Sequence, residues 1–331
     1  MGRNAPAIHI LRARVLHRPR VQDSRDHVRN LRRAARKKMT EVFIITGVTC
    51  SGKTRRAIEL AKKIGGEIIS CDSVQVYRGM DIGSAKAAPE ELAEVPHHLI
   101  DVADCDKPFD VAEYARLAKA ALDGISARGK RAVVCGGSGF YLRSWFAAVA
   151  DGVKIPGDVK KICDEIEKSG AGRLAEALLK IDPDAARTVD ILNPRRAKNA
   201  LARCMASGKT CAKLAEEFAA LPCPMGEISR NVQILDAPDE ELSERIRERT
   251  RRMLSGGLIE ETEKLLARGI KNNPSAASAI GYRETIAWLE SGGKNERELE
   301  GQIARDTAAL VKKQRKYFKN SLLKNAQYRL A

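Results

Sequence analysis

The chain has 331 residues, of which 44% are hydrophobic and 31% are charged, so it can form a core and remain soluble. No run approaches the ~18 apolar residues of a membrane span, and no membrane partner is expected. The net charge of +16 is unevenly distributed, because twelve Lys and Arg residues lie within the first 40 residues against only Asp23 and Asp26. A polyanionic partner is compatible with this charge, but charge alone does not establish one.

The basic segment 1–38 has three interpretations. The segment is interpreted as a disordered arm that binds nucleic acid, as a transit peptide, or as the product of translation from a start codon upstream of the true one. Two acidic residues and a near absence of Ser argue against the transit peptide, and Met39 stands just before the first strand-like run. The eight cysteines form no CxxC pair, so a structural zinc site is not expected. Several of them lie inside apolar strand patterns, which suits reduced, buried thiols in the cytoplasm.

Short apolar runs alternate with helical periods after Met39. The runs predict strands, and the periods predict helices that cover a parallel sheet on both faces. The expected strands are EVFIIT (41–46), EIISC (67–71), HHLIDV (97–102), RAVVCGG (131–137) and NVQILDAP (231–238), and the expected helices include 55–66 and 110–129. The fold class is therefore α/β, with a P-loop NTPase-like parallel sheet.

Segment 153–222 breaks this rhythm, because it contains helical periods and no convincing strand. It is expected to be a helical insertion domain within a core formed by 39–152 and 223–331. The chain ends in a further helix over 297–324, whose apolar stripe includes Leu299, Ile303, Leu310, Phe318 and Leu322.

The first predicted strand is followed by GVTCSGKT (47–54), which matches the phosphate-binding pattern G-x-x-x-x-G-K-[ST]. The glycines let backbone N–H groups approach an anion, and the helix that begins here adds its partial positive charge. Lys53 supplies a full charge, and Thr54 offers a hydroxyl to Mg²⁺. A second SGKT (207–210) lacks the preceding glycine and strand, and is interpreted as a helix that ends at Gly208 with Thr210 as the next cap.

Two further segments follow strands at the same expected edge of the sheet. Asp72 comes just after the second strand, where a carboxylate beside an anion site suits proton transfer or metal binding, or simply caps a turn. Ser138 follows Gly136 and Gly137 after the AVV strand, as a hydroxyl at the crevice or as part of an ordinary glycine turn.

Together these motifs resemble the bacterial tRNA dimethylallyltransferases. The resemblance covers roughly 39–325, in the family's order, and is carried by GVTCSGKT, DSVQVYRGMDIGSAK, PHHLIDV, GGSGFY, NPRRAKNAL, the second SGKT, RIRERTRRML and GYRE. It implies transfer of a dimethylallyl group from dimethylallyl diphosphate to N6 of the adenosine 3′-adjacent to the anticodon of tRNA. The implied partner is the tRNA anticodon stem-loop, and a cytoplasmic monomer is expected.

The resemblance also implies roles for individual residues. The loop Gly47, Val48, Thr49, Cys50, Ser51, Gly52, Lys53 and Thr54 would bind the diphosphate together with Arg245 or Arg249, and Thr54 would hold Mg²⁺. Asp72 would accept the proton of the adenine amine, with Ser138, Lys53 and Thr54 as the other catalytic residues. The tRNA contacts would come from Asp72, Ser73, Val74, Gln75, Ser138, Lys160, Arg195, Arg196, Ala197, Lys198 and Asn199.

The chain departs from the family pattern in several places. Ser138 replaces the usual Thr, Cys50 replaces a smaller residue, and Ala308 stands where Arg is common. The zinc finger of eukaryotic members is missing. Three alternatives stay open: a small-molecule P-loop kinase that uses ATP, a prenyltransferase that acts on free adenine nucleotides, and a non-catalytic RNA-binding protein with a nucleotide switch.

Overall fold

The computed structural model describes residues 40–322 and 329–330, so the expectations for segment 1–38 lie outside the described residues. The strands are β1 (Thr40–Gly47), β2 (Glu67–Ser70), β3 (His97–His98), β4 (Ala132–Cys135), β5 (Ile228–Leu235) and β6 (Arg329–Leu330). The α-helices are α2 (Lys53–Ile64), α3 (Pro89–Glu94), α4 (Val111–Ala127), α5 (Gly139–Arg143), α6 (Gly157–Lys168), α7 (Ala171–Ile181), α8 (Pro194–Ser207), α9 (Cys211–Ala219), α10 (Asp239–Ser255), α11 (Leu258–Ala267), α12 (Pro274–Ala277), α13 (Tyr282–Glu290) and α14 (Glu296–Tyr317).

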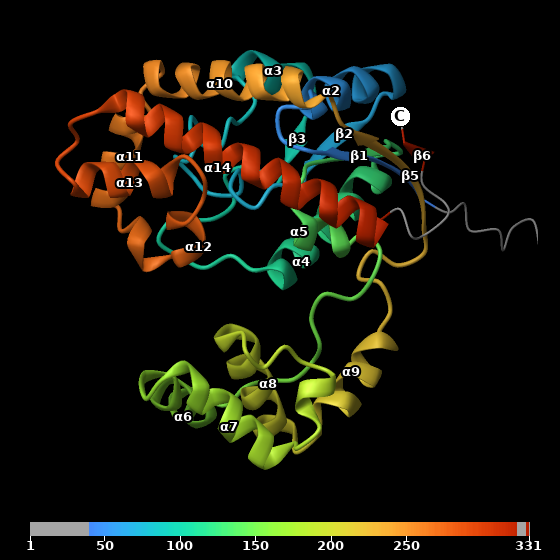
Figure 1. Cartoon of the computed structure of the whole chain (residues 1–331). Coiled ribbons are helices and arrows are strands. Elements are labelled where there is room, and N and C mark those ends of the chain that lie inside the picture. Colours follow the sequence, from blue (N-terminus) through green and yellow to red (C-terminus); the bar gives the residue numbers. More distant parts are fainter. Residues whose placement is uncertain (1–39, 323–328, 331) are drawn as a thin grey trace, which may run out of the picture. The chain divides into compact units, whose positions relative to one another are not determined.

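The strands form one sheet in the order β3-β2-β4-β1-β5-β6, and every neighbouring pair is parallel (Figure 1). The apolar run of β1 pairs with β4 on one side and β5 on the other, so Ile44 lies opposite both Val134 and Val232. A central parallel strand is buried on both faces and therefore carries a continuous apolar run. The predicted α/β class with a parallel sheet is confirmed.

Successive residues of β1 point to opposite faces of the sheet, and this alternation builds two apolar layers. Ile45 packs with Ala57, Ile58 and Ala61 of α2 on one face. Ile44 belongs to the larger cluster on the other face, which also takes residues of α4, α10 and α14. Because β4 pairs parallel with both β1 and β2, the loops that follow these three strands leave from the same edge of the sheet.

Between β4 and β5 the described chain is helical. Helices α6, α7, α8 and α9 pack around a separate cluster of buried residues that includes Leu174, Leu178 and Leu201. The helical character expected for 153–222 is therefore present over α6–α9. None of the described helices is both long and apolar enough to cross a membrane.

Two local predictions have different outcomes. The third strand is wrong beyond His98, because Leu99 and Asp101 have φ angles of 65° and 56°, which no extended strand can contain. The second SGKT forms the predicted turn: α8 ends before Gly208, which has a left-handed φ of 67°, and the Thr210 side chain accepts a hydrogen bond from Lys213 N.

Candidate active site

The loop 47–54 joins β1 to the first turn of α2. Gly47 has a φ of 142°, and a side chain there would lie 2.0 Å from the Leu235 carbonyl oxygen, so only glycine fits. The Lys53 Nζ donates to the Val48 carbonyl oxygen at 2.5 Å. Burial lowers the pKa of Lys53, because a charged ammonium loses hydration in this setting. A bound anion would offset that loss of hydration.

The loop is contacted by two arginines of α10, one turn apart. Arg249 Nη1 donates to the Thr49 hydroxyl at 3.1 Å. Arg245 Nη1 instead donates to the Cys50 carbonyl oxygen at 3.2 Å, and its other nitrogen is paired with Glu241. Both guanidinium groups reach the loop, but only Arg249 lines the cavity described next. The structure thus separates two arginines that the sequence pattern could not distinguish.

A cavity of about 290 Å³ opens beside the loop. Its polar wall contains Thr49, Lys53 and Arg249, and these groups favour an anion. The rest of the lining includes an apolar group that suits a short hydrocarbon chain: Ile246, Met253, Ile280, Ile303 and Leu310. Leu310, which the sequence pattern placed in a core stripe, is only half-buried because it faces this space. The cavity therefore fits a molecule with a phosphate head and a small apolar tail.

Asp72 lies where β2 ends, at the edge shared with the phosphate loop. Its Oδ1 accepts hydrogen bonds from Val74 N at 2.8 Å and Gln75 N at 3.3 Å, so the carboxylate caps the turn that follows. Within residues 40–322, Oδ2 has no hydrogen-bond partner. One oxygen holds the turn while the other stays free to accept a proton. The capping and catalytic interpretations of Asp72 are thus compatible.

The turn that follows β4 packs directly against Cys71, the residue before Asp72. A side chain at Gly136 would lie 2.0 Å from the Cys71 carbonyl oxygen, and Ser138 N donates to that oxygen at 3.3 Å. The Thr46 hydroxyl donates to the Gly136 carbonyl oxygen at 2.7 Å. These contacts fix the three loops together and place Ser138 beside Asp72 on one cavity wall.

That second cavity has a volume of about 620 Å³. Its lining combines Asp72 and Ser138 with aromatic and cationic side chains: Phe140, Arg143, Phe146, Lys313 and Tyr317. Aromatic faces with interspersed cations suit a stacked nucleic-acid base and its phosphates. Both cavities are lined by Asp72, Val74, Gly137, Leu310 and Gln314, so Asp72 faces a space on each side.

Comparisons with known proteins show the family to which this chain belongs. The family model described as IPP transferase matches residues 75–321. The chain belongs to the IPP transferase family. This IPP transferase is 44% identical over 279 residues to the tRNA dimethylallyltransferase of Opitutus terrae, which covers 84% of this chain and 90% of the relative. It is 40% identical over 281 residues to the tRNA dimethylallyltransferase of an Exiguobacterium species, with 84% of each chain covered.

Solved structures show the same relationship. The full-length tRNA isopentenylpyrophosphate transferase of Bacillus halodurans superposes with a TM-score of 0.63 at 32% identity, over 88% of this chain and 89% of that one. A eukaryotic dimethylallyltransferase acting on tRNA superposes with a TM-score of 0.76 at 25% identity, over 88% and 73%. The core of this IPP transferase accordingly has the P-loop NTPase-like fold.

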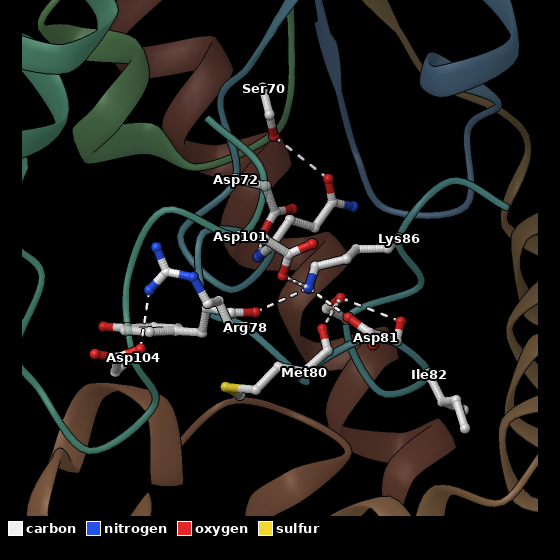
Figure 2. A network of polar contacts seen from close by, with 12 residues as sticks. Ser70, Asp72, Arg78, Met80, Asp81, Ile82, Lys86, Asp101 and Asp104 are labelled. Atoms are coloured by element: carbon white, nitrogen blue, oxygen red, sulfur yellow. Dashed lines mark hydrogen bonds and ion pairs between the residues drawn. The ribbon is translucent and has the colours of Figure 1, made fainter. Parts of the chain in front are cut away.

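The segment 72–86 of this IPP transferase is held in place by one buried cation. The Lys86 side chain is 6% exposed, and its Nζ donates to the Tyr77 carbonyl oxygen at 2.8 Å. The same ammonium pairs with Asp81 and Asp101 (Figure 2). The long motif DSVQVYRGMDIGSAK therefore ends in the lysine that fastens it.

The same segment is also anchored from α11. The Glu261 carboxylate accepts hydrogen bonds from the backbone N–H groups of three successive residues, Asp81, Ile82 and Gly83. The Tyr282 hydroxyl donates to Glu261 Oε1 at 2.7 Å. This contact explains the tyrosine of the GYRE motif. Sequence reasoning missed Glu261, because nothing in its own neighbourhood marks it.

Gln314 is the second residue that sequence reasoning missed. Its side-chain oxygen accepts a hydrogen bond from Thr49 N at 2.8 Å, and its nitrogen donates to the Gly137 carbonyl oxygen at 3.3 Å. It therefore joins the phosphate loop to the turn that carries Ser138. The only signal in the sequence was its place in the TAALVKKQ run.

The residues predicted for tRNA contact divide between two parts of the fold. Asp72, Ser73, Val74 and Ser138 line the larger cavity, and Gln75 follows on the same turn. Lys160 is exposed on α6; Arg195, Arg196 and Asn199 are exposed on α8, while Ala197 is fully buried in the helical cluster. Arg196 is paired with Asp190, and Lys198 with Asp164 and Glu167. The hydrogen bonds that Lys198 donates to the Asp164 and Glu167 carboxylates raise the pKa of this lysine.

Thr54 lies in the first turn of α2. Its Oγ1 forms no hydrogen bond within residues 40–322. Mg²⁺ prefers oxygen ligands and is commonly held by one or two protein oxygens together with substrate phosphates. A free hydroxyl next to Lys53 fits that donor set.

Proposed function

We propose that this protein transfers a dimethylallyl group from dimethylallyl diphosphate to N6 of the adenosine 3′-adjacent to the anticodon in tRNA, releasing diphosphate. The observation that carries this proposal is the position of Asp72 on the shared wall of two unlike cavities. The smaller one matches a prenyl diphosphate, and the larger one matches an unstacked base.

The diphosphate would lie against Thr49, Lys53 and Arg249, and the five-carbon chain against the apolar lining. Negative charge grows on the diphosphate as the C1–O bond breaks, and fixed cations and backbone N–H groups stabilise that charge. A Mg²⁺ held by the Thr54 hydroxyl and the diphosphate oxygens would neutralise part of the leaving group's charge. Burial lowers the pKa of Lys53, and a bound anion would favour its charged form, which supports a role for this residue beside the diphosphate.

The adenine would enter the larger cavity with its amine toward Asp72. The N6 nitrogen attacks C1, the C1–O bond breaks, and the electron pair leaves with the diphosphate. The N6 proton passes to the free Oδ2 of Asp72, which removes the positive charge that forms on nitrogen. The Ser138 hydroxyl lies on the same wall and can hydrogen-bond the base.

The base must leave the stack of the anticodon loop to reach this cavity. We propose that 153–222 acts as a helical insertion domain that grips the anticodon stem-loop through Lys160 and 195–199, while 39–152 and 223–331 form the catalytic core. Arg195 has no ion pair within the described residues, whereas Arg196 and Lys198 would exchange carboxylate partners for phosphates. We also propose a monomer acting in the cytoplasm.

The deciding experiment supplies labelled dimethylallyl diphosphate together with tRNA, AMP or neither. Label that enters tRNA supports the proposal, and label that enters AMP alone indicates a nucleotide prenyltransferase. ATP hydrolysis or phosphoryl transfer without prenyl transfer would instead support the kinase alternative. RNA binding without any of these reactions would leave the non-catalytic protein as the remaining alternative.

A further inference from the structure

Three helix ends of the α6–α9 unit meet at a cluster of metal-ligand side chains. Asp182 follows the last residue of α7, Cys204 lies in the last turn of α8, and Cys211 is the first residue of α9. One ligand atom from each residue lies within 4.8 Å of the others. Their exposed fractions are 3%, 1% and 5%, so the cluster is buried.

The turn formed by the second SGKT brings the two cysteines together. The left-handed conformation at Gly208 ends α8, and Thr210 starts α9, so the chain reverses between the two thiols. The Sγ atoms end 3.6 Å apart. The six residues between them do not give a usual zinc spacing, and for this reason the sequence alone did not indicate a site.

The distance between the two thiols matches a tetrahedral ion. Two thiolates bound at about 2.3 Å to one zinc ion lie about 3.8 Å apart across the tetrahedron edge. The carboxylate is also oriented, since Asp182 Oδ2 accepts from Cys211 N at 2.7 Å and Oδ1 from Asp184 N at 3.3 Å. Each oxygen keeps a second lone pair, and ligating carboxylates are usually hydrogen-bonded in this way.

We propose that Asp182, Cys204 and Cys211 bind one zinc-class divalent cation, with a water as the fourth ligand. Binding would displace the proton of each thiol and join the ends of α7, α8 and α9 through three metal–ligand bonds. The site lies outside both cavities and takes no part in prenyl transfer.

A bound metal ion would stabilise the α6–α9 unit. Its buried cluster is small, and it includes four alanines, which remove little apolar area from water: Ala185, Ala197, Ala200 and Ala202. Small units often depend on a metal or a cross-link to supplement their core.

The test uses the full-length protein purified under reducing conditions without chelator. Elemental analysis is expected to find one zinc per chain. After removal of the metal, titration with Co²⁺ should give one equivalent of a tetrahedral visible spectrum with a thiolate charge-transfer band. The substitutions Cys204→Ser and Cys211→Ser should each abolish that band, whereas Cys163→Ser, another buried cysteine of the same cluster, should preserve it.

Thermal unfolding gives a second readout. A zinc-selective chelator should lower the Tm of the unmodified protein and of C163S but leave that of C204S unchanged. If C204S does not fold, Asp182→Asn and the Co²⁺ spectrum of the unmodified protein decide the matter. Absence of a tetrahedral Co²⁺ spectrum in the reduced protein would overturn the proposal. So would a native intact mass that shows a Cys204–Cys211 disulfide in place of bound metal.

Discussion

Gln314 Oε1 accepts a hydrogen bond from the backbone N–H of Thr49 at 2.8 Å, although that N–H belongs to the loop that would bind the diphosphate. The same amide donates to the Gly137 carbonyl oxygen, and it lines both cavities. A donor phosphate that takes the Thr49 N–H would displace Gln314 Oε1, which belongs to the amide that also holds the Gly136–Ser138 turn. The two cavities therefore share the Gln314 side chain.

Replacement of Gln314 tests this relationship. In Gln314→Leu, Thr49 N–H no longer has an internal competitor, so the KM for dimethylallyl diphosphate should stay the same or fall. The turn that carries Ser138 loses a fixed contact, so kcat should fall about fivefold, as expected for a hydrogen bond of about 1 kcal/mol. Steady-state kinetics at saturating tRNA would measure both. A higher KM with unchanged kcat would show instead that Gln314 only helps to bind the donor.

Asp72 is predicted to act as the proton acceptor. Asp72→Asn keeps an oxygen for Val74 N and Gln75 N, so the turn should remain folded, but the amide cannot take a proton. We expect kcat to fall roughly 10²–10⁴-fold, with donor affinity changed less than about threefold. Asp104→Asn, an exposed partner of Arg78, is the control. Near-normal single-turnover rates in the Asp72 variant would remove the general-base role.

The two arginines of α10 should differ in their effect on the donor. Arg249 lines the diphosphate cavity, whereas Arg245 contacts a carbonyl oxygen and Glu241. Arg249→Ala should weaken binding of inorganic diphosphate by about 10–100-fold, because a charge-assisted hydrogen bond contributes about 1.5–3 kcal/mol. Arg245→Ala should weaken it less than about threefold. Calorimetric titration of both variants measures the difference, and equal losses would contradict the assignment.

Glu261 should be a structural requirement for activity. Glu261→Ala leaves the N–H groups of Asp81, Ile82 and Gly83 without their carboxylate partner and should lower the free energy of unfolding by about 2–4 kcal/mol. Glu263→Ala, an exposed position on the same helix, should change it by less than about 0.5 kcal/mol. Urea unfolding gives both values. Similar stability in the two variants would show that the segment has another anchor.

Glu67 should make stability depend on pH. Hydrogen bonds from Arg128, followed by those from His98 and Lys130, lower the pKa of this buried carboxyl from 4.5 to about 2. The unfolded chain therefore binds a proton at higher pH than the folded one, so the contribution is complete above about pH 5 and is lost as the pH falls toward 2. Glu67→Gln should cost about 2–3 kcal/mol at pH 7, and less at pH 4. A pH-independent difference in urea unfolding would contradict this origin.

The sequence predicted those features that are local in the chain. An apolar run followed by G-x-x-x-x-G-K-[ST] specifies strand, loop and helix within one short segment, and the structure has all three at β1 and α2. The third strand was predicted too long, because periodicity does not reveal the positive φ angles of Leu99 and Asp101. Lys86 forms ion pairs with Asp81 and Asp101, and no hydrophobic pattern predicts these contacts.

Contacts between distant segments could not be predicted in this way. Gln314 lies 265 residues from Thr49 in the chain, and Glu261 lies 178 residues or more from the backbone groups it holds. Only the register of the sheet and the packing of α11 and α14 bring such residues together. A single sequence contains no signal for that packing beyond the apolar stripe of each helix. The choice between Arg245 and Arg249 depended on the same information.

The internal contacts of the phosphate loop have a further consequence for selectivity among cellular anions. Lys53 already donates to Val48, and Thr49 N–H already donates to Gln314, so an incoming inorganic phosphate exchanges these hydrogen bonds and gains less than it would from free donors. A prenyl diphosphate makes the same exchange but also removes five carbons from water, at about 0.8 kcal/mol each, or roughly 4 kcal/mol. Free phosphate would then compete only weakly with the prenyl diphosphate for the loop, even though no side chain of the loop repels it.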